Sequence, residues 1–157
     1  MTREDLITTI QEKFSQDVIE LVDRSPDRIY VEIAPQAIVP VATYMFKEAK
    51  ARFSIASGVD VRTHLEILYH FTVEYLHLIL SLRVKLDKTK PEIDSLAGIS
   101  KSTNWIEREM WELLGIEFKG HPDLRRLLLA NEWPQGVYPL RQDYQEWDSN
   151  AIRDRGV

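Results

Sequence analysis

A regular alternation of apolar and polar residues between positions 65 and 87 limits the fold of this chain more than any other feature. Its apolar positions are Leu65, Ile67, Tyr69, Phe71 and Val73, followed by Leu78, Leu80, Leu82, Val84 and Leu86. Neighbouring side chains of a β-strand point to opposite faces of the sheet, so each run predicts a strand with one buried face. Only a few residues around positions 75–77 separate the runs, which predicts that the two strands pair antiparallel.

Three segments show helical spacing. Apolar residues recur with this spacing in residues 3–14, and a second helix is predicted from Pro40 to about residue 52. A third helix is predicted over residues 104–114, with Asn104 as its N-cap. Each of these helices has an apolar side that we expect to pack on a sheet.

A hairpin is predicted near the N-terminus, because residues 17–23 and 28–33 are β-prone runs that are joined by a Ser-Pro-Asp turn. The predicted order of elements is therefore α-β-β-α-β-β-α. This order predicts an α+β fold, with helices packed on a mainly antiparallel or mixed sheet.

The sequence changes character after residue 115. Residues 116–144 contain three prolines and two glycines and show no sustained period, and all four tryptophans lie after position 104. A long irregular segment rich in Trp, Tyr and Arg favours a binding surface over disorder. We therefore predict an α+β domain over residues 1–115, followed by an extended partner-docking tail over residues 116–157.

The composition excludes several kinds of chemistry. The chain has no cysteine, which excludes disulfides, thiol nucleophiles and thiolate-bound metals or iron–sulfur clusters. A net charge of −5 without a basic patch argues against a nucleic-acid partner. The N-terminus is acidic where a signal peptide is basic, and no run of 18 apolar residues occurs. We therefore expect no export signal and no direct insertion into a membrane.

The four histidines lack the spacing of a metal site. His64 and His70 would lie about 20 Å apart on one strand, and neither an HxH nor an HExxH motif occurs. We therefore expect no metal ion in this chain.

Glu107 falls within the apolar arc of the third predicted helix, whereas Arg108, Glu109 and Glu112 fall on its other side at about 100° per residue. A carboxylate on an apolar face must be neutral or have a cationic partner. We predict that Glu107 pairs with an arginine of the tail, for which the candidates are Arg125, Arg126 and Arg141. The alternative is acid–base catalysis, but no nucleophile or oxyanion site accompanies it.

Residues 120–123, Gly-His-Pro-Asp, permit two interpretations. His121 and Asp123 could form a proton relay, because histidine titrates near neutral pH. We favour a tight turn, in which Gly120 supplies conformational freedom, Pro122 fixes the backbone, and His121 caps a neighbouring carbonyl or carboxylate.

Two ordered motifs resemble the 30 kDa subunit family of respiratory NADH dehydrogenase. Residues 107–128 read EREMWELLGIEFKGHPDLRRLL, which is similar to that family's pattern of ERE, an aromatic and an acid, then GI-x-F-x-GHP-x-x-R. Residues 138–144, YPLRQDY, are similar to its later PLR-x-DY element. The resemblance extends over about residues 65–144 and reaches the N-terminal part through the order of elements only.

The resemblance implies a cofactor-free structural subunit in the peripheral arm of a membrane-bound energy-converting oxidoreductase, on the cytoplasmic face. It implies docking against a large catalytic subunit and a small iron–sulfur subunit, with the membrane arm contacted only indirectly. Iron–sulfur clusters, and [NiFe] or flavin groups, would then belong to partner subunits. Structural and docking roles, without catalysis, are implied for the residues that match the motifs: Glu107, Arg108, Glu109, Gly115, Gly120, His121, Pro122, Arg125, Arg126, Arg141, Asp143 and Tyr144.

Three departures from the family pattern bear on which complex contains the chain. Glu112 stands where Asp is usual, Tyr138 stands where a His often precedes PLR, and residues 57–64 are shorter than the corresponding loop. A chain without long extensions is similar to relatives in membrane-bound [NiFe] hydrogenases and ferredoxin-linked complexes, so we favour that type. NADH:quinone oxidoreductase is the alternative. A stand-alone acid–base enzyme and an assembly factor are the other hypotheses.

Overall fold

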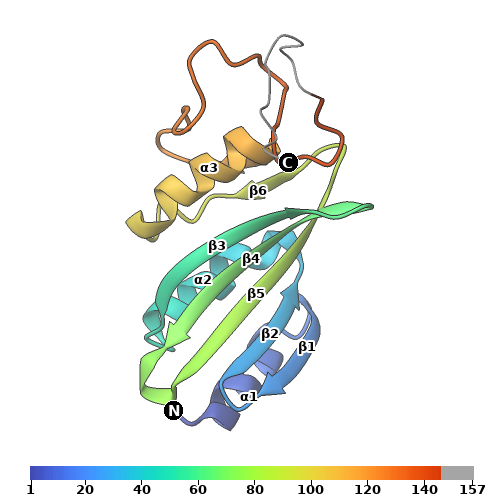
Figure 1. The fold of residues 1–157 in the computed structure, drawn as a ribbon. Coiled ribbons are helices and arrows are strands. Elements are labelled where there is room, and N and C mark those ends of the chain that lie inside the picture. The colour runs from blue at the N-terminus through green and yellow to red at the C-terminus, as the bar shows by residue number, and fades with distance from the viewer. Residues whose placement is uncertain (146–157) are drawn as a thin grey trace, which may run out of the picture.

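A five-stranded sheet forms the centre of the computed structural model, which describes residues 1–145 (Figure 1). The strands are β1 (Val18–Ser25), β2 (Arg28–Ile33), β3 (Arg52–Asp60), β4 (His64–Val73) and β5 (Leu78–Asp87). Their order across the sheet is β1-β2-β5-β4-β3. Only β2 and β5 pair in parallel, and the other neighbours are antiparallel. This mixed sheet confirms the predicted α+β fold.

The alternating residues form the predicted antiparallel pair, β4 and β5. Their register places Leu65 opposite Leu86 and Phe71 opposite Leu80, so buried residues face buried residues along the pair. The chain crosses between the two strands through a short 3₁₀ turn (Glu74–Leu76) and His77, whose φ of 50° is left-handed. The period of two in the sequence therefore corresponds to one buried face of the sheet.

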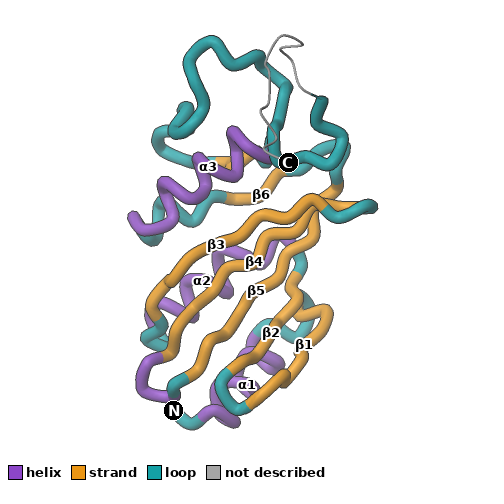
Figure 2. Tube along the Cα trace, in the orientation of Figure 1, coloured by secondary structure: helices purple, strands orange, loops and turns teal. Residues whose placement is uncertain are grey.

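Helices α1 (Arg3–Lys13) and α2 (Ile38–Lys47) cover the same face of the sheet, as the tube view shows (Figure 2). A capping box between Thr2 and Asp5 satisfies the first turn of α1. A 3₁₀ turn (Pro35–Ala37) leads into α2, which contributes Val41 and Met45 to the core. The opposite face of the sheet has no helix of residues 1–145 packed on it (Figure 1).

Strand β3 was not predicted, and helix α2 ends at Lys47 instead of near residue 52. The register of β3 against β4 shifts between Phe53 and Ile55, and a bulge of this kind breaks the alternation by which a strand is recognised. The strand also contains Gly58, which weakens its apolar pattern. We therefore attribute the missed strand to the bulge and to its small residues.

Helix α3 (Asn104–Leu114) lies beside the β3 edge of the sheet (Figure 1). A 3₁₀ turn (Lys101–Thr103) precedes it, so Thr103 is the N-cap and the prediction for Asn104 was wrong. The helix and β3 are in close contact, because a Cβ added to Gly58 would overlap the side chain of Leu114. Glycine is therefore the residue that permits this contact.

A second sheet, of two strands, joins the segment before α3 to the segment after it. Strands β6 (Glu92–Asp94) and β7 (Glu117–Lys119) pair in parallel and bury Ile93 and Phe118. Neither strand was predicted, because three residues are too few to show a period. Residues 120–145 then follow an irregular path around α3 (Figure 2).

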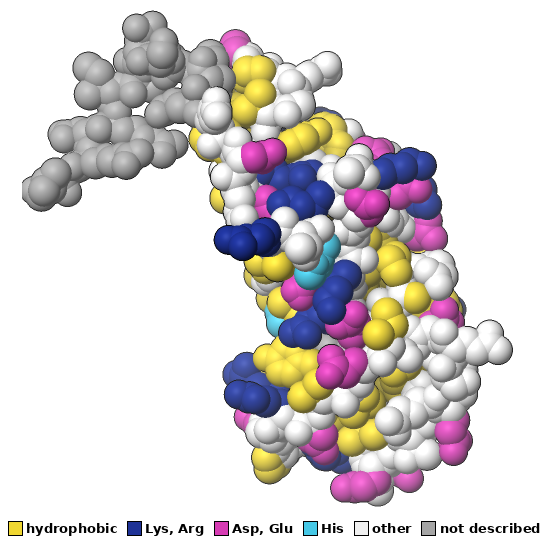
Figure 3. Space-filling view, turned by 90° about the vertical axis from the view of Figure 1, so that its right-hand side faces the viewer, with side chains coloured by type: hydrophobic (Ala, Val, Ile, Leu, Met, Phe, Trp, Pro, Cys, Tyr) yellow, Lys and Arg dark blue, Asp and Glu magenta, His cyan; other side chains and the backbone are white. Residues whose placement is uncertain are grey.

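Charged side chains of both signs are mixed on the surface. Figure 3 shows acidic and basic groups next to each other on one face, without a continuous basic area. Within residues 1–145, no helix has both the length and the apolar character needed to cross a bilayer.

Candidate functional site

Helix α3 buries three charged side chains, namely Glu107, Arg108 and Glu112. Buried charges need compensating bonds, because desolvation of an unpaired charge is costly. Each of the three binds backbone groups of a segment that is separate from the helix. Helix α3 is therefore the element that positions the surrounding chain.

Glu107 binds the loop that follows β6. The Ser95 hydroxyl donates a hydrogen bond of 2.5 Å to Glu107 Oε2, and the backbone N–H of Leu96 donates one of 2.7 Å to Oε1. No arginine of residues 1–145 forms an ion pair with this carboxylate, so the predicted pairing was wrong. The physical reason is that a hydroxyl and an amide already supply the donors that a buried carboxylate requires.

The carboxyl of Glu107 lies in an unusual electrostatic environment. Burial raises the pKa of Glu107 from 4.5 to about 7, although the bonds from Ser95 and Leu96 oppose the rise. Burial also raises the pKa of Tyr69 well above its ordinary value, and the charge of Glu107 adds to that effect. The Tyr69 hydroxyl is buried without a hydrogen-bond partner among residues 1–145.

Arg108 and Glu112 bind consecutive groups of the irregular segment. Arg108 donates to the carbonyls of Arg125 and Arg126, at 3.0 and 2.7 Å. Glu112 accepts from the three backbone N–H groups of residues 127–129, at 2.5 to 3.3 Å. From the helical spacing, both side chains were predicted to lie away from the apolar arc of the helix. The structure places them on that side, where residues 125–129 cover and bury them. We find no signal in the helix sequence itself that separates Glu112 from an exposed acid.

The Gly-His-Pro-Asp segment forms the predicted turn. Gly120 has a φ of 76°, and the backbone N–H of Asp123 donates to Nδ1 of His121 at 3.0 Å. The neutral ring therefore carries its proton on Nε2, which donates to the carbonyl of Asn104 at 3.0 Å. The Asp123 carboxylate binds Arg125 instead, at 2.9 Å, so the two side chains form no relay. Pro122 is exposed in this turn.

The end of α3 provides the next contact with the tail. Gly115 ends the helix with a φ of 71°, and a Cβ added there would lie 2.5 Å from the ring of Tyr138. Arg141 donates from Nε to the carbonyl of Leu114 at 2.5 Å, and its guanidinium lies over the Tyr138 ring. Gly115 is therefore needed both for its backbone conformation and for the approach of an aromatic ring.

Asp60, at the end of β3, binds the segment that follows Arg141. Its carboxylate accepts from the backbone N–H of Gln142 at 2.8 Å and pairs with Lys88 at 2.5 Å. Burial alone would raise the pKa of Asp60, but Lys88, Gln142 and the nearby Arg141 lower it below its ordinary value. Asp60 was not predicted as a site residue, since a lone acid in an unrecognised strand carries no pattern.

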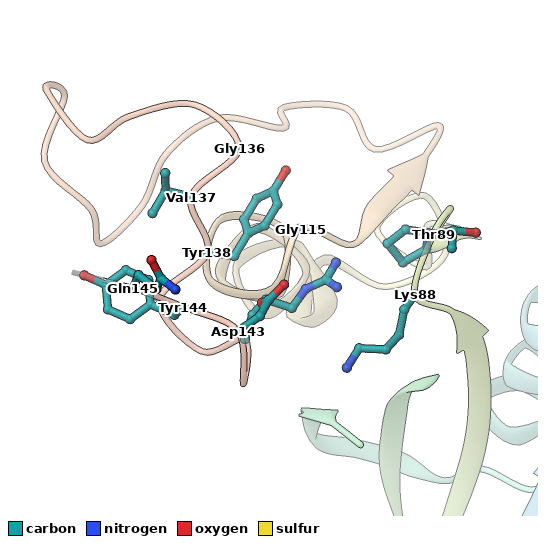
Figure 4. Close-up of a pocket in the computed structure, with 11 residues that line it drawn as sticks. Lys88, Thr89, Gly115, Gly136, Val137, Tyr138, Asp143, Tyr144 and Gln145 are labelled. Carbon is teal, nitrogen blue, oxygen red and sulfur yellow. The ribbon is translucent and has the colours of Figure 1, made fainter. Parts of the chain in front are cut away.

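The remaining predicted residues occupy the outer part of the tail. Arg126 donates to the carbonyls of Ala130 and Trp133, and Tyr144 stacks on Trp133 with ring centroids 6.2 Å apart. Asp143 is exposed beside an open pocket of about 560 Å³, which lies between Tyr138 and Lys88 (Figure 4). These contacts order the segment around α3.

Within residues 1–145, no three His, Asp or Glu side chains are grouped closely enough to bind a metal ion. What the geometry can do is to hold loops in place and to present large apolar side chains. Four of these are exposed around α3: Trp105 is 69% exposed, Leu128 63%, Leu140 56% and Ile55 51%.

One known family and several curated relatives match most of the chain. The family described as "Respiratory-chain NADH dehydrogenase, 30 Kd subunit" matches residues 31–149. A subunit of the F(420)H(2) dehydrogenase of Methanosarcina mazei is 32% identical, over 98% of this chain and 99% of that protein. A subunit of the NADH-quinone oxidoreductase of Chloroherpeton thalassium is 35% identical, over 87% of this chain and 58% of that protein.

Two solved structures share the fold. A chain of the membrane-bound sulfane sulfur reductase, described as an archaeal respiratory membrane complex, aligns with a TM-score of 0.76. That alignment has 19% identity and covers 90% of this chain and 85% of the other. The trypsin-resistant fragment (1–134) of Nqo5 aligns with a TM-score of 0.66 and 18% identity, over 79% of this chain and the whole fragment.

Proposed function

The chain belongs to the respiratory-chain NADH dehydrogenase 30 kDa subunit family and is a subunit of a complex I-like oxidoreductase; within such a complex, we propose that it is a structural docking subunit. It would join a large catalytic subunit to a small iron–sulfur subunit in the peripheral arm, on the cytoplasmic face of the membrane. The redox cofactors would belong to those partners. The chain would contribute shape and contact surface.

The contacts of helix α3 and the apolar side chains exposed beside it support this role. Its buried charges Glu107, Arg108 and Glu112 bind backbone groups, which is a structural use of charge. At the same time, Trp105 and Leu128 remain exposed beside it. Large exposed apolar side chains next to an ordered scaffold are typical of a surface that a partner covers. We propose structural and docking roles for the motif residues, and for residues 116–157 the role of a docking tail.

The identity of the complex is a separate proposal. From the sequence, we favoured a membrane-bound hydrogenase or a related ferredoxin-linked complex. The end-to-end match to the F(420)H(2) dehydrogenase relative now favours a complex that oxidises F(420)H(2). This match is the observation that supports the F(420)H(2) dehydrogenase type as a second candidate.

Purification from the native host tests the docking role. An affinity-tagged chain, isolated from mild-detergent extracts of membranes, should bring with it a large catalytic subunit and an iron–sulfur subunit at a constant ratio. Mass spectrometry of the intact assembly identifies the neighbours. A nickel-containing subunit would indicate the hydrogenase type, and a subunit that oxidises F(420)H(2) would indicate the other. Recovery of the tagged chain alone would contradict the proposal.

A truncation separates docking by the tail from folding of the domain. Removing residues 120–157 retains β6 and β7, so circular dichroism should still show the helices and the sheet. We expect this variant to lose its partners. Gly98→Ala is a control, because no atom lies within 4 Å of the added Cβ. Full retention of the partners by the truncated chain would contradict a docking tail.

A further inference from the structure

A groove lined mainly by apolar residues lies between β3 and α3. It consists of two adjoining hollows, of about 260 and 420 Å³, which share Ile55, Ile106 and Glu109. One hollow continues to Gly58 and Leu113, and the other to Phe53 and Trp105. The residues that line it on the strand span positions 53–58, a length of about 20 Å in an extended chain. We call this surface the α3 groove.

The α3 groove contains a single charged group. Within the described part of the chain, Glu109 is the only charged residue that lines either hollow, and it is half-buried at the place where they meet. Among residues 1–145 it has neither an ion pair nor a hydrogen bond, in contrast to Glu107 and Glu112 on the same helix. An unpaired carboxylate between apolar walls favours a ligand that brings a cation to it.

One wall of the α3 groove is the edge of a sheet. Strand β3 ends the order β1-β2-β5-β4-β3, so among residues 1–145 it pairs with β4 on one side only. The unpaired side of an edge strand presents N–H and C=O groups that can pair with an added strand. Exposed Ile55 and Trp105 lie along this edge and along the facing end of α3.

We propose that the α3 groove binds an extended segment of a partner subunit, which pairs with the edge of β3. Apolar side chains of the segment occupy the two hollows, and a lysine or arginine between them pairs with Glu109. Trp105 adds an aromatic face for the same cation. Such a segment needs about five or six residues to match the strand. This inference rests on the proposed docking role, and it specifies the occupant and the recognition.

Photo-crosslinking in the assembled complex tests the position of the occupant. A photoreactive amino acid replaces Ile55 in the full chain, and another replaces Ile19, which is exposed on β1 at the opposite edge of the sheet. We expect the probe at position 55 to label one short segment with a basic residue in a partner subunit. The probe at position 19 should not label that segment. Crosslinks from position 55 only within the chain, to a second copy of it, or to a segment without a basic residue would overturn the proposal.

Charge reversal tests recognition by Glu109. Glu109→Arg should reduce the recovery of the partner that carries the segment about tenfold or more, because like charges then face each other in the groove. Glu20→Arg on β1 is the matched control, since it makes the same change in charge at an exposed residue. Exchange of the crosslinked lysine or arginine for Glu should restore recovery with Glu109→Arg. Circular dichroism and the melting temperature confirm that both variants fold.

The outcomes distinguish this inference from the docking role itself. The wild-type chain and Glu109→Arg could recover the partners in equal amounts. That result would overturn the proposed binding of a segment in the α3 groove and leave the docking role intact. Failure of the wild-type chain to recover any partner overturns the docking role as well.

Discussion

The sheet and the α3 region of this protein are held together by different interactions. Apolar side chains in strict register fill the space between β4, β5 and the helices α1 and α2. Around α3, buried Arg108 and Glu112 bind the backbone of residues 125–129 instead. Apolar burial is non-directional and extends over the whole core, whereas each polar contact is local and depends on one side chain. The two regions should therefore fail in different ways.

The largest expected effect is in the sheet core. Phe71→Ala removes a fully buried ring that packs edge-on against Phe46 and Phe53. We expect a loss of about 3–5 kcal/mol in the free energy of unfolding, measured by urea denaturation. Thr72→Ala, on the other face of the same strand, should cost less than about 1 kcal/mol. Equal losses for the two variants would contradict an apolar core on one face.

The second prediction concerns pH and the buried Glu107. Its pKa of about 7 in the folded state exceeds its ordinary value, so the folded protein binds this proton more tightly than the unfolded chain. The resulting stability is complete below about pH 4.5 and is lost as the pH rises to about 7. The loss corresponds to at most about 3 kcal/mol. Urea denaturation at pH 5 and pH 8 measures it.

Glu107→Gln provides the comparison for that measurement. Glutamine can accept from the Leu96 N–H and donate to the Ser95 hydroxyl, while it carries no titratable proton. The variant should lose less stability than the wild type between pH 5 and pH 8. His121, whose Nε2 lies 3.9 Å from Glu107 Oε2, and Tyr69 are present in both proteins. Parallel pH curves would show that Glu107 does not titrate in this range.

The third prediction concerns the junction between the two regions. Gly115→Ala places a Cβ at a left-handed φ of 71° and against the Tyr138 ring. We expect a cost of about 2 kcal/mol from the backbone alone, and faster proteolysis within residues 120–145. Gly98→Ala, with no atom near the added Cβ, is the matched control. Unchanged proteolysis would mean that Tyr138 packs elsewhere.

The smallest effect is expected from a single polar contact. Glu112→Gln exchanges one acceptor oxygen for an amide, so at least one N–H of residues 127–129 loses its partner. A local cost of about 1 kcal/mol should follow. Hydrogen exchange of these amides should accelerate, while exchange in β4 and β5 stays unchanged. Glu109→Gln, which removes no bond among residues 1–145, should leave both regions as they are.

The same contrast explains what could be predicted from the sequence. Strands β4 and β5 were recognised because a buried sheet face imposes a period of two on the sequence. Helices α1, α2 and α3 were recognised because helical packing imposes the spacing of a helix on the apolar residues. Strand β3 was missed because the bulge at Phe53 and Ile55 interrupts that period. Strands β6 and β7, with three residues each, are too short to have one.

The polar contacts of the candidate site were harder to predict for a physical reason. Glu107 was expected to need an arginine, but its donors are the Ser95 hydroxyl and a backbone amide. Every residue other than proline has such an amide, so no residue type identifies the donor in advance. The structure places motif residues on α3 and in the segment around it. Which motif residue binds which segment depends on the path of residues 120–145. The sequence of this segment has no regular period from which its path could be predicted.

The parallel pairing of β2 with β5 has a consequence for how the chain folds during synthesis. Ile29 pairs beside Leu80, so the first hairpin needs a partner that is made about fifty residues later. Until β5 has left the ribosome, β2 has only β1 as a neighbour, and the backbone groups along its other edge have no partner strand. Contacts of such long sequence separation slow folding and prolong the exposure of apolar edges. The N-terminal hairpin therefore stays without one of its neighbours in the sheet until most of the chain up to β5 has been made.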